Sequence, residues 1–253
     1  MPTASKKPVA IVTGAGSGVG RAIATMLAAL GYDLALAGRR QAPLQETAEI
    51  AERHAPASDT SAIVIPTDMS DPRQVRALID ETLTRFGHVD ALINNAAIAE
   101  FTPIESADHE QLLRTLKINT LGPGAAIYAL WPTFRSQGKG RVINISTMGT
   151  VSPFPGLCAY GASKCALESF ARSIANEAGD DDIRAYNVAP GAIETEMLRG
   201  FISEEQFPSN QCLTPDDVAQ VVIDLLTGDR EEENGATIRL PNPGPRPTAE
   251  DAG

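Results

Sequence analysis

The sequence predicts an α/β fold in a single domain, with helices on both faces of a doubly wound parallel sheet. Short apolar runs typical of buried strands alternate with helical segments along nearly the whole chain, which favours a parallel sheet. A chain of 253 residues is also long enough to bury one large core without a second domain. The expected strands are residues 8–13, 33–38, 61–67, 89–94, 140–146, 183–188 and 236–240. We assign residues 1–240 to the domain and residues 241–253, rich in Pro, Gly and acidic side chains, to a flexible tail.

The first expected strand is followed at once by a glycine-rich turn and then by an apolar helix. The turn runs from Thr13 to Gly20 with the sequence TGAGSGVG, and apolar residues then recur as far as Leu30. Glycines let the backbone approach a ligand, and a helix N-terminus offers free N–H groups to a pyrophosphate. This order of strand, turn and helix predicts a dinucleotide site, with an ordinary turn as the alternative. The candidate binding residues are Gly14, Ser17, Gly18, Val19 and Gly20.

Polar residues or glycines also follow the later strands. They are Gly38, Arg39 and Arg40, then Asp68, Asn94 and Asn95, Ser146 and Thr147, and Pro190 and Gly191. Ligands of open parallel sheets bind beyond the carboxyl ends of the strands, so we expect these residues to converge on one edge of the sheet.

Tyr160 and Lys164 are the candidate acid-base pair. A spacing of four places the phenol and the ammonium on one face of a helix. A cation held nearby favours the phenolate, so Lys164 is expected to lower the pKa of Tyr160. The same spacing occurs in many helices without chemical significance, and the rest of the chain decides between these interpretations.

These motifs together resemble the short-chain dehydrogenase/reductase family in its classical form. The matches are the glycine turn, Asp68, the run Asn94-Asn95-Ala96-Ala97, Asn119, Tyr160 with Lys164, and Pro190-Gly191, all in family order. The resemblance covers nearly the whole chain and implies a Rossmann fold. It also implies an oxidoreductase that transfers a hydride between a nicotinamide cofactor and a carbonyl or secondary alcohol, without a metal.

The resemblance also implies roles for individual residues. Tyr160 would be the general acid or base, and Lys164 would lower its pKa and bind ribose hydroxyls. Asn119 would hold, through its carbonyl, a water linked to Lys164; it lies in a helical segment, residues 107–135, where Gly122-Pro123-Gly124 predicts an irregularity. The alternative for Asn119 is an exposed helix position.

The remaining cofactor contacts carry over in the same way. Asp68 would meet the adenine edge, although it could instead cap the helix that begins after Pro72. Asn95 would line the cleft. Pro190, Gly191, the Ile193 backbone and the Thr195 hydroxyl would meet the nicotinamide carboxamide.

Two neighbouring residues compete for the hydroxyl that binds the substrate carbonyl. Counting without gaps from Arg141 to Tyr160 selects Thr147, whereas the pattern Ser-x-x-Gly selects Ser146. Consecutive residues of a strand face opposite sides, so one of the two must point away. The register favours Thr147, and Ser146 stays open as the alternative.

The turn after the second strand favours NADP(H) over NAD(H). Gly38 stands where an NAD site would place a carboxylate, and Arg39 and Arg40 can hold a 2′-phosphate. Ser17 is a departure, because some NADP-binding relatives have a basic residue there. NAD(H) therefore remains the alternative cofactor.

The segment from Glu196 to Thr214 is expected to cover a small, moderately apolar substrate. Its apolar residues are Met197, Leu198, Phe201, Ile202 and Phe207, and Phe154, Pro155, Leu157 and Trp131 could lie nearby. By resemblance, the helices that carry Asn119 and Tyr160 would form a homodimer or homotetramer.

Composition restricts the other functions. A net charge of −11 disfavours nucleic acid or an anionic membrane as partner, and three cysteines without metal-ligand spacing indicate reduced thiols. With no signal segment or apolar run of membrane length, the sequence predicts a cytoplasmic protein. Two alternatives to the enzyme remain. One is a nucleotide-sensing protein without turnover, and the other is an isomerase or dehydratase of the longer sugar-nucleotide branch, which the chain length disfavours.

Overall fold

Seven parallel strands form one sheet in the order β3-β2-β1-β4-β5-β6-β7. The computed structural model describes residues 6–56, 60–230 and 233–244. The strands are β1 (Val9–Thr13), β2 (Asp33–Gly38), β3 (Ala62–Pro66), β4 (Ala91–Asn94), β5 (Lys139–Ile145), β6 (Asp182–Pro190) and β7 (Thr237–Leu240). The strand order reverses between β1 and β4, and such a switch point opens a crevice at the carboxyl edge of the sheet. The predicted parallel α/β fold is therefore confirmed.

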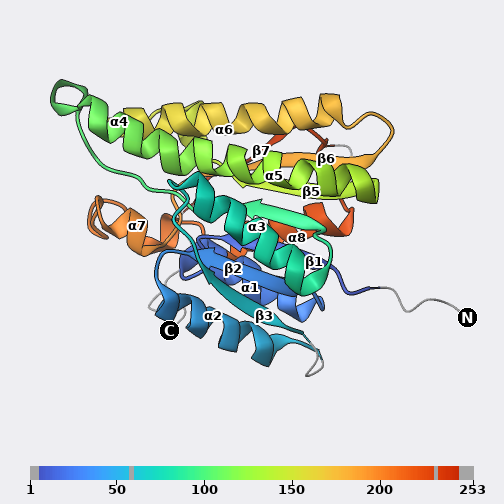
Figure 1. The fold of residues 1–253 in the computed structure, drawn as a ribbon. Helices are drawn as coiled ribbons and strands as arrows, with labels where there is room; N and C mark the ends of the chain where they lie inside the picture. Colours follow the sequence, from blue (N-terminus) through green and yellow to red (C-terminus); the bar gives the residue numbers. More distant parts are fainter. Residues whose placement is uncertain (1–5, 57–59, 231–232, 245–253) are drawn as a thin grey trace, which may run out of the picture.

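Helices cover both faces of the sheet (Figure 1). Helices α1 (Gly18–Ala29), α2 (Gln41–His54) and α8 (Pro215–Thr227) pack on one face, and α3 (Pro72–Phe86), α5 (Gly122–Gln137) and α6 (Cys158–Glu177) pack on the other. Two shorter helices, α4 (His109–Leu116) and α7 (Glu196–Arg199), lie at the end where the strands finish.

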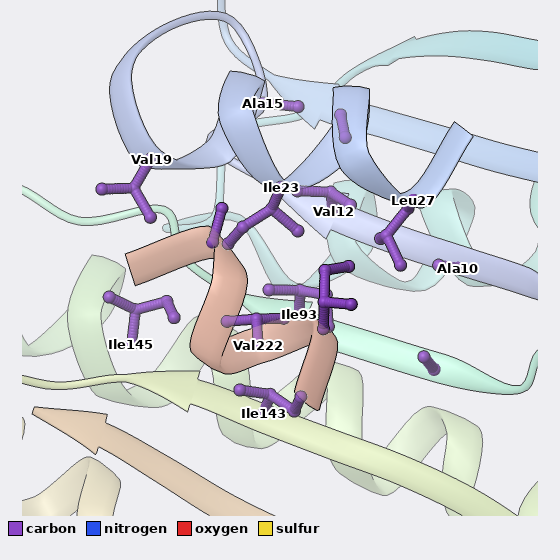
Figure 2. Packing of buried hydrophobic residues seen from close by; sticks show 14 of the residues in the cluster. Ala10, Val12, Ala15, Val19, Ile23, Leu27, Ile93, Ile143, Ile145 and Val222 are labelled. Carbon is purple, nitrogen blue, oxygen red and sulfur yellow. The ribbon is translucent and has the colours of Figure 1, made fainter. Parts of the chain in front are cut away.

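The two cores follow from the alternation of side chains along the central strands. Ala10 and Val12 of β1 point toward α1 and α8, whereas Ile11 between them belongs to the core under α3, α5 and α6. Figure 2 shows the first core, which joins Val12 of β1, Ile23 of α1 and Val222 of α8 in one cluster. Because both faces are covered, the strands read as continuous apolar runs in the sequence.

The predicted irregularity of the long helical segment is confirmed, and it lies earlier than the glycines. Helix α4 ends at Leu116, a π-helical turn spans Lys117–Leu121, and α5 continues from Gly122. Pro123 has no N–H to donate to the preceding turn, which favours a local break in the α-helical ladder. The turn places Asn119 in the interior of the protein, fully buried.

A ladder of three buried asparagines and one half-buried threonine crosses the sheet near its carboxyl edge. Asn94, Asn144, Asn187 and Thr237 are register neighbours on β4, β5, β6 and β7. Asn94 Nδ2 donates to Asn144 Oδ1 at 2.9 Å, Asn144 Nδ2 donates to Asn187 Oδ1 at 3.0 Å, and Asn187 Nδ2 reaches Thr237 Oγ1 at 3.2 Å. A shift of one residue in any of these pairings would break the ladder, so it specifies the register of the strands.

We expect the substitution Asn144→Ala to lower the free energy of unfolding by about 2 kcal/mol or more. The alanine leaves Asn94 Nδ2 and Asn187 Oδ1 buried without these partners. Urea unfolding of the variant measures the loss, with Asn176→Ala on the exposed face of α6 as the matched control. An unchanged urea midpoint for Asn144→Ala would show that the ladder does not stabilise the sheet.

Candidate active site

A cleft of about 970 Å³ opens at the carboxyl edge of the sheet. It brings together nearly all the residues that the sequence placed after strands, and their predicted convergence is confirmed. The predicted residues that line it are Gly14, Ser17, Gly18, Val19, Arg39, Arg40, Asp68, Asn95, Ser146, Thr147, Tyr160, Lys164, Pro190, Gly191, Ile193 and Thr195. Gly20 and Asn119 are not among its lining residues and lie behind its wall.

The glycine turn is held so tightly that two of its positions exclude a side chain. Gly14 has a φ of +66°, and a Cβ there would lie 2.8 Å from the Cα of Ala96. A Cβ on Gly20 would lie 2.3 Å from the carbonyl oxygen of Gly14. Gly20 therefore packs directly against the backbone of the turn. It does not line the cleft, so its predicted contact with the cofactor is replaced by this packing role.

The side chain of Asn95 fastens the turn to the neighbouring strand. Its Nδ2 donates to the carbonyl oxygens of Thr13 at 2.9 Å and Gly14 at 3.2 Å. Helix α1 begins directly after the turn; its N-cap, Ser17, makes no side-chain capping hydrogen bond, and its first turn contains no acidic residue. The helix therefore presents its positive end and free N–H groups to the cleft, which suits an anionic group.

Two arginines without partners lie at the end of the cleft beyond β2. Arg39 and Arg40 are exposed, and neither makes an ion pair or a hydrogen bond within the part of the chain that the structure describes. Gly38 before them leaves space, because a Cβ there would meet nothing closer than Leu44 Cδ2 at 3.4 Å. This end of the cleft is thus electropositive although the whole chain carries a net charge of −11.

Asp68 faces the cleft and does not cap the following helix. Its Oδ1 accepts hydrogen bonds from the backbone N and the Oγ of Ser70, both at 2.8 Å. The N-cap of α3 is Asp71, whose carboxylate accepts from Arg73 N at 2.9 Å. The capping alternative for Asp68 is wrong because Asp71, directly before Pro72, already occupies that position.

Tyr160 and Lys164 lie one turn apart on α6, at the centre of the cleft wall. The ammonium nitrogen of Lys164 lies 5.7 Å from the centroid of the Tyr160 ring. Lys164 is only 1% exposed, and its Nζ donates to the carbonyl oxygen of Ile145 at 2.7 Å. The predicted juxtaposition of the phenol and the ammonium is therefore present.

The pKa of Tyr160 shifts in the direction opposite to the one predicted. Burial raises it to about 12, opposed only by a hydrogen bond with Thr147, which favours the phenolate. Burial also lowers the pKa of Lys164 to about 8. Desolvation thus sets the direction of the shift, the ammonium of Lys164 does not contribute to it, and Tyr160 holds its proton at neutral pH.

Thr147, and not Ser146, is directed toward Tyr160. The hydroxyl of Thr147 is hydrogen bonded to the Tyr160 phenol, and its Oγ1 accepts from Gly149 N at 3.1 Å. Ser146 is 2% exposed, and its Oγ donates to Glu168 Oε1 at 2.7 Å. The register count in the sequence therefore selected the hydroxyl that the structure places beside the phenol.

Asn119 is buried behind α6, so the alternative of an exposed helix position is wrong. Its Nδ2 donates to Ile98 O at 2.9 Å and to Ser163 Oγ at 3.0 Å, and its Oδ1 accepts from Ile98 N at 2.9 Å. These bonds join the π-helical turn to α6 and to the segment after β4. Asn119 consequently supports the wall that carries Tyr160.

Two residues of the site were not predicted. Glu168 follows Lys164 at a spacing of four, which was the available signal, and its carboxylate lies behind Thr147. Asn242 was assigned to the tail, yet it lines the cleft and binds Ala192 through both side-chain atoms, at 2.9 Å and 2.7 Å. That contact spans 50 residues and has no local sequence signal. Residues 245–253 of the predicted tail lie outside the described residues.

The other end of the cleft is apolar. All five predicted apolar residues of the segment 196–214 line it, together with Phe154 and Leu157 from the opposite side, whereas Pro155 and Trp131 do not. Arg199 of α7 pairs with Glu194 and donates to Phe207 O at 2.9 Å. This pairing holds the segment in place over the cleft and neutralises a carboxylate there.

Neither a membrane span nor a metal cluster is found in the described ranges. Among them, no helix combines the length and apolar character that crossing a membrane requires. Within residues 6–56, 60–230 and 233–244, no group of three or more His, Cys, Asp or Glu side chains is arranged to hold a metal ion.

A doubly wound sheet with a glycine turn and a tyrosine–lysine pair at its carboxyl edge defines a class of nucleotide-dependent oxidoreductases. Comparison with known proteins gives the family, because the short chain dehydrogenase model matches residues 8–206. The chain belongs to the short-chain dehydrogenase/reductase family and is an oxidoreductase of that family.

Individual relatives agree with this assignment. The chain is 34% identical over 245 residues to the short-chain dehydrogenase/reductase eriH of Hericium erinaceus, covering 93% of this chain and 97% of that protein. The crystal structure of levodione reductase is similar with a TM-score of 0.86 and 29% identity, covering 92% of this chain and 96% of that one. A 3-ketoacyl-(acyl-carrier-protein) reductase from Brucella melitensis, solved in complex with NADH, is similar with a TM-score of 0.85 and 27% identity, covering 95% and 99%.

Because the ammonium of Lys164 is buried, we expect its replacement by an uncharged side chain to raise the stability of the protein in a pH-dependent way. The pKa of Lys164 falls from 10.5 to about 8 on folding, so the unfolded chain binds the proton more tightly. The resulting loss of folding free energy has its full size below about pH 8. It fades as the pH rises from about 8 to 10.5. Lys164→Met should therefore raise the free energy of unfolding near neutral pH by on the order of 1–3 kcal/mol, reduced by the lost hydrogen bond to Ile145.

Thermal melts near pH 7 and near pH 10 measure this effect, with a smaller gain expected at the higher pH. Lys117→Met is the matched control, because Lys117 is exposed and its removal should leave the pH dependence of wild type. An equal gain at both pH values would contradict the assignment of the effect to the buried charge.

Proposed function

We propose that this protein is an NADP(H)-dependent oxidoreductase that transfers a hydride between the nicotinamide and a carbonyl or secondary alcohol, with Tyr160 as general acid or base. The observation that carries the proposal is the set of Thr147, Tyr160 and Lys164 in a cleft that the glycine turn also lines. The turn, which leaves no room for a Cβ at Gly14, and the uncapped N-terminus of α1 fit the pyrophosphate of a dinucleotide.

The roles of the residues follow from their geometry in the reducing direction. When bound, the nicotinamide cofactor supplies the hydride. Thr147 donates a hydrogen bond to the substrate carbonyl oxygen, and Tyr160 donates its phenolic proton to the oxygen as negative charge develops there. A pKa raised to about 12 keeps that proton on Tyr160 until the alkoxide accepts it. In the oxidising direction the same phenol, once deprotonated, accepts the proton of the alcohol.

Lys164 and Asn119 support this exchange of protons. Lys164 binds the ribose hydroxyls of the cofactor and contributes positive charge below the phenol, at 5.7 Å from the ring centroid. By resemblance to the family, the carbonyl of Asn119, in the π-helical turn, would hold a water that links Lys164 to solvent. Pro190, Gly191, Ile193 and Thr195 would meet the carboxamide end of the cofactor, Asp68 would meet its adenine edge, and Asn95 lines the cleft.

The preference for NADP(H) rests on the charges after β2. Arg39 and Arg40 have no partners among the described residues and lie in the lining of the cleft, where two guanidinium groups can hold a 2′-phosphate. No carboxylate replaces Gly38 to bind a 2′-hydroxyl and repel the phosphate.

The substrate is a small molecule with a substantial apolar part. Its carbonyl meets Thr147 and Tyr160, while Phe154, Leu157 and the apolar residues of the segment 196–214 surround the rest. The hydroxyl of Thr147 faces Tyr160, which supports an enzyme with turnover rather than a nucleotide-sensing protein without it.

We also propose that the protein forms a homo-oligomer through the outer face of α5 and α6. Leu121 and Tyr128 are 59% and 70% exposed there, and Tyr128 makes an edge-to-face contact with Phe170 of α6. Large apolar side chains in one exposed patch are typical of subunit interfaces.

Tyr160→Phe tests the assigned acid. Turnover should fall by roughly 10²-fold or more, because the phenyl ring has no proton to donate, while the affinity for cofactor changes little. Oxidation of NADPH with a panel of ketones measures turnover, and the fluorescence of bound NADPH measures affinity. Tyr32→Phe, directly before β2 and outside the lining of the cleft, is the matched control. Substantial activity in Tyr160→Phe would refute the role of the phenol.

Arg39→Ala tests the cofactor preference. We expect the dissociation constant for NADPH to rise by roughly 10-fold or more, because the charge-assisted hydrogen bonds to the 2′-phosphate are lost, with little change for NADH. Arg53→Ala, an exposed arginine at the end of α2, is the control. Gly38→Asp should favour NADH, since the open space at Gly38 admits the carboxylate. Equal effects of Arg39→Ala on both cofactors would contradict the assignment.

A further inference from the structure

Glu168 has a buried carboxylate to which neither the family match nor the mechanism above assigns a role. It lies on α6 one turn beyond Lys164 and is 7% exposed. Burying a carboxylate costs free energy, and no lysine or arginine among the described residues pairs with it. Because burial of the Glu168 carboxylate lowers the stability of the fold, its presence indicates a role in the active site.

The carboxylate holds both neighbours of the hydroxyl that faces Tyr160. Oε1 of Glu168 accepts hydrogen bonds from Ser146 Oγ at 2.7 Å and from Thr150 Oγ1 at 3.0 Å. Thr150 Oγ1 also lies 3.0 Å from the carbonyl oxygen of Thr147. The segment from 146 to 150 is therefore tied to α6 on either side of Thr147.

The extended backbone at the end of β5 links the position of Ser146 to the orientation of Thr147. The backbone of Thr147 is extended, with φ −160° and ψ 150°, so adjacent side chains point to opposite sides. Drawing Ser146 toward α6 consequently turns Thr147 toward the cleft. The Oγ1 of Thr147 accepts from Gly149 N at 3.1 Å, which leaves its own proton to donate.

The carboxylate is itself anchored to the sheet. The backbone carbonyl oxygen of Glu168 accepts from Asn187 Nδ2 at 3.1 Å, and Asn187 belongs to the asparagine ladder across β4, β5 and β6. The position of Oε1 relative to the ends of the strands is thus set by hydrogen bonds on both sides of the residue.

We propose that Glu168 is a positioning residue for the reaction, in which its buried carboxylate holds Ser146 and Thr150 so that Thr147 presents its hydroxyl to the substrate carbonyl. This inference rests on the proposed oxidoreductase function. It assigns Ser146 a different role from the one considered in the sequence. Ser146 donates a hydrogen bond to Glu168 directly after β5 and does not bind the substrate.

Replacement of Glu168 by leucine and by glutamine separates positioning from packing. Glu168→Leu removes the acceptor, and we expect kcat to fall by roughly 10- to 100-fold while the dissociation constant for NADPH stays within about threefold of wild type. Glu168→Gln keeps an acceptor oxygen at similar size and should retain most of kcat. Ser169→Ala, an exposed neighbour on α6, is the matched control. A wild-type kcat in Glu168→Leu, or an equal loss in leucine and glutamine variants, would overturn the proposal.

A second pair of variants tests the same contact without removing the carboxylate. The double variant Ser146→Ala with Thr150→Ala removes both donors, and it should reproduce the loss of kcat seen in Glu168→Leu. Adding Glu168→Leu to it should cause no further loss, because the variants then act on one interaction. Losses that multiply would contradict the shared role, and a wild-type kcat in the double variant alone would overturn the proposal even if Glu168→Leu does not fold.

Hydrogen exchange at the amide of Gly149 gives a readout that needs no substrate. This amide donates to Thr147 Oγ1, so loosening of the segment 146–150 should speed its exchange in the double variant and in Glu168→Leu but not in Glu168→Gln. If wild type oxidises no NADPH on a broad carbonyl panel, the proposed function fails. Unchanged exchange at Gly149 would separately refute the restraint by Glu168.

Discussion

The packing of helix α6 against the ends of β5 and β6 is the constraint on which the site depends. The ammonium of Lys164 donates a hydrogen bond to the carbonyl oxygen of Ile145 at the end of β5. The side-chain amide of Asn187 in β6 donates a hydrogen bond to the backbone carbonyl oxygen of Glu168. These bonds cross the interface between a helix and a sheet whose register is specified by buried asparagines. Tyr160 can face the cleft with a defined geometry only because the helix that carries it is held in this way.

Burial acts on the two ionisable groups of α6 in opposite directions. It raises the pKa of Tyr160 to about 12 and lowers that of Lys164 to about 8, since in each case it disfavours the charged form. The phenol therefore retains its proton at neutral pH, which suits the role of acid that we propose for it. The buried ammonium reduces the stability of the fold near neutral pH, and its proposed role beside the phenol would account for this cost, a trade-off common at active sites.

The charge of the whole chain and the field in the cleft have opposite signs where the phosphates of a cofactor would lie. Arg39 and Arg40 stand at one end of the cleft, and the N-terminus of α1 points into it with no acidic side chain in its first turn. The acidic surface elsewhere disfavours polyanionic macromolecules, whereas the cleft itself favours a small anion. The position of the positive groups in the cleft, and not the net charge of the chain, therefore favours a small anionic ligand.

The sequence alone determined the parallel α/β fold, the glycine turn, and the residues that meet at the carboxyl edge, because strand periodicity, turn chemistry and the order of motifs are local properties of the chain. Only the tertiary structure decided that Thr147 rather than Ser146 faces Tyr160 and that Asn242 joins the wall of the cleft. It also reversed the expected shift in the pKa of Tyr160. The reason is physical: burial, and hydrogen bonds between residues far apart in the chain, depend on how the elements pack, and no local pattern encodes them.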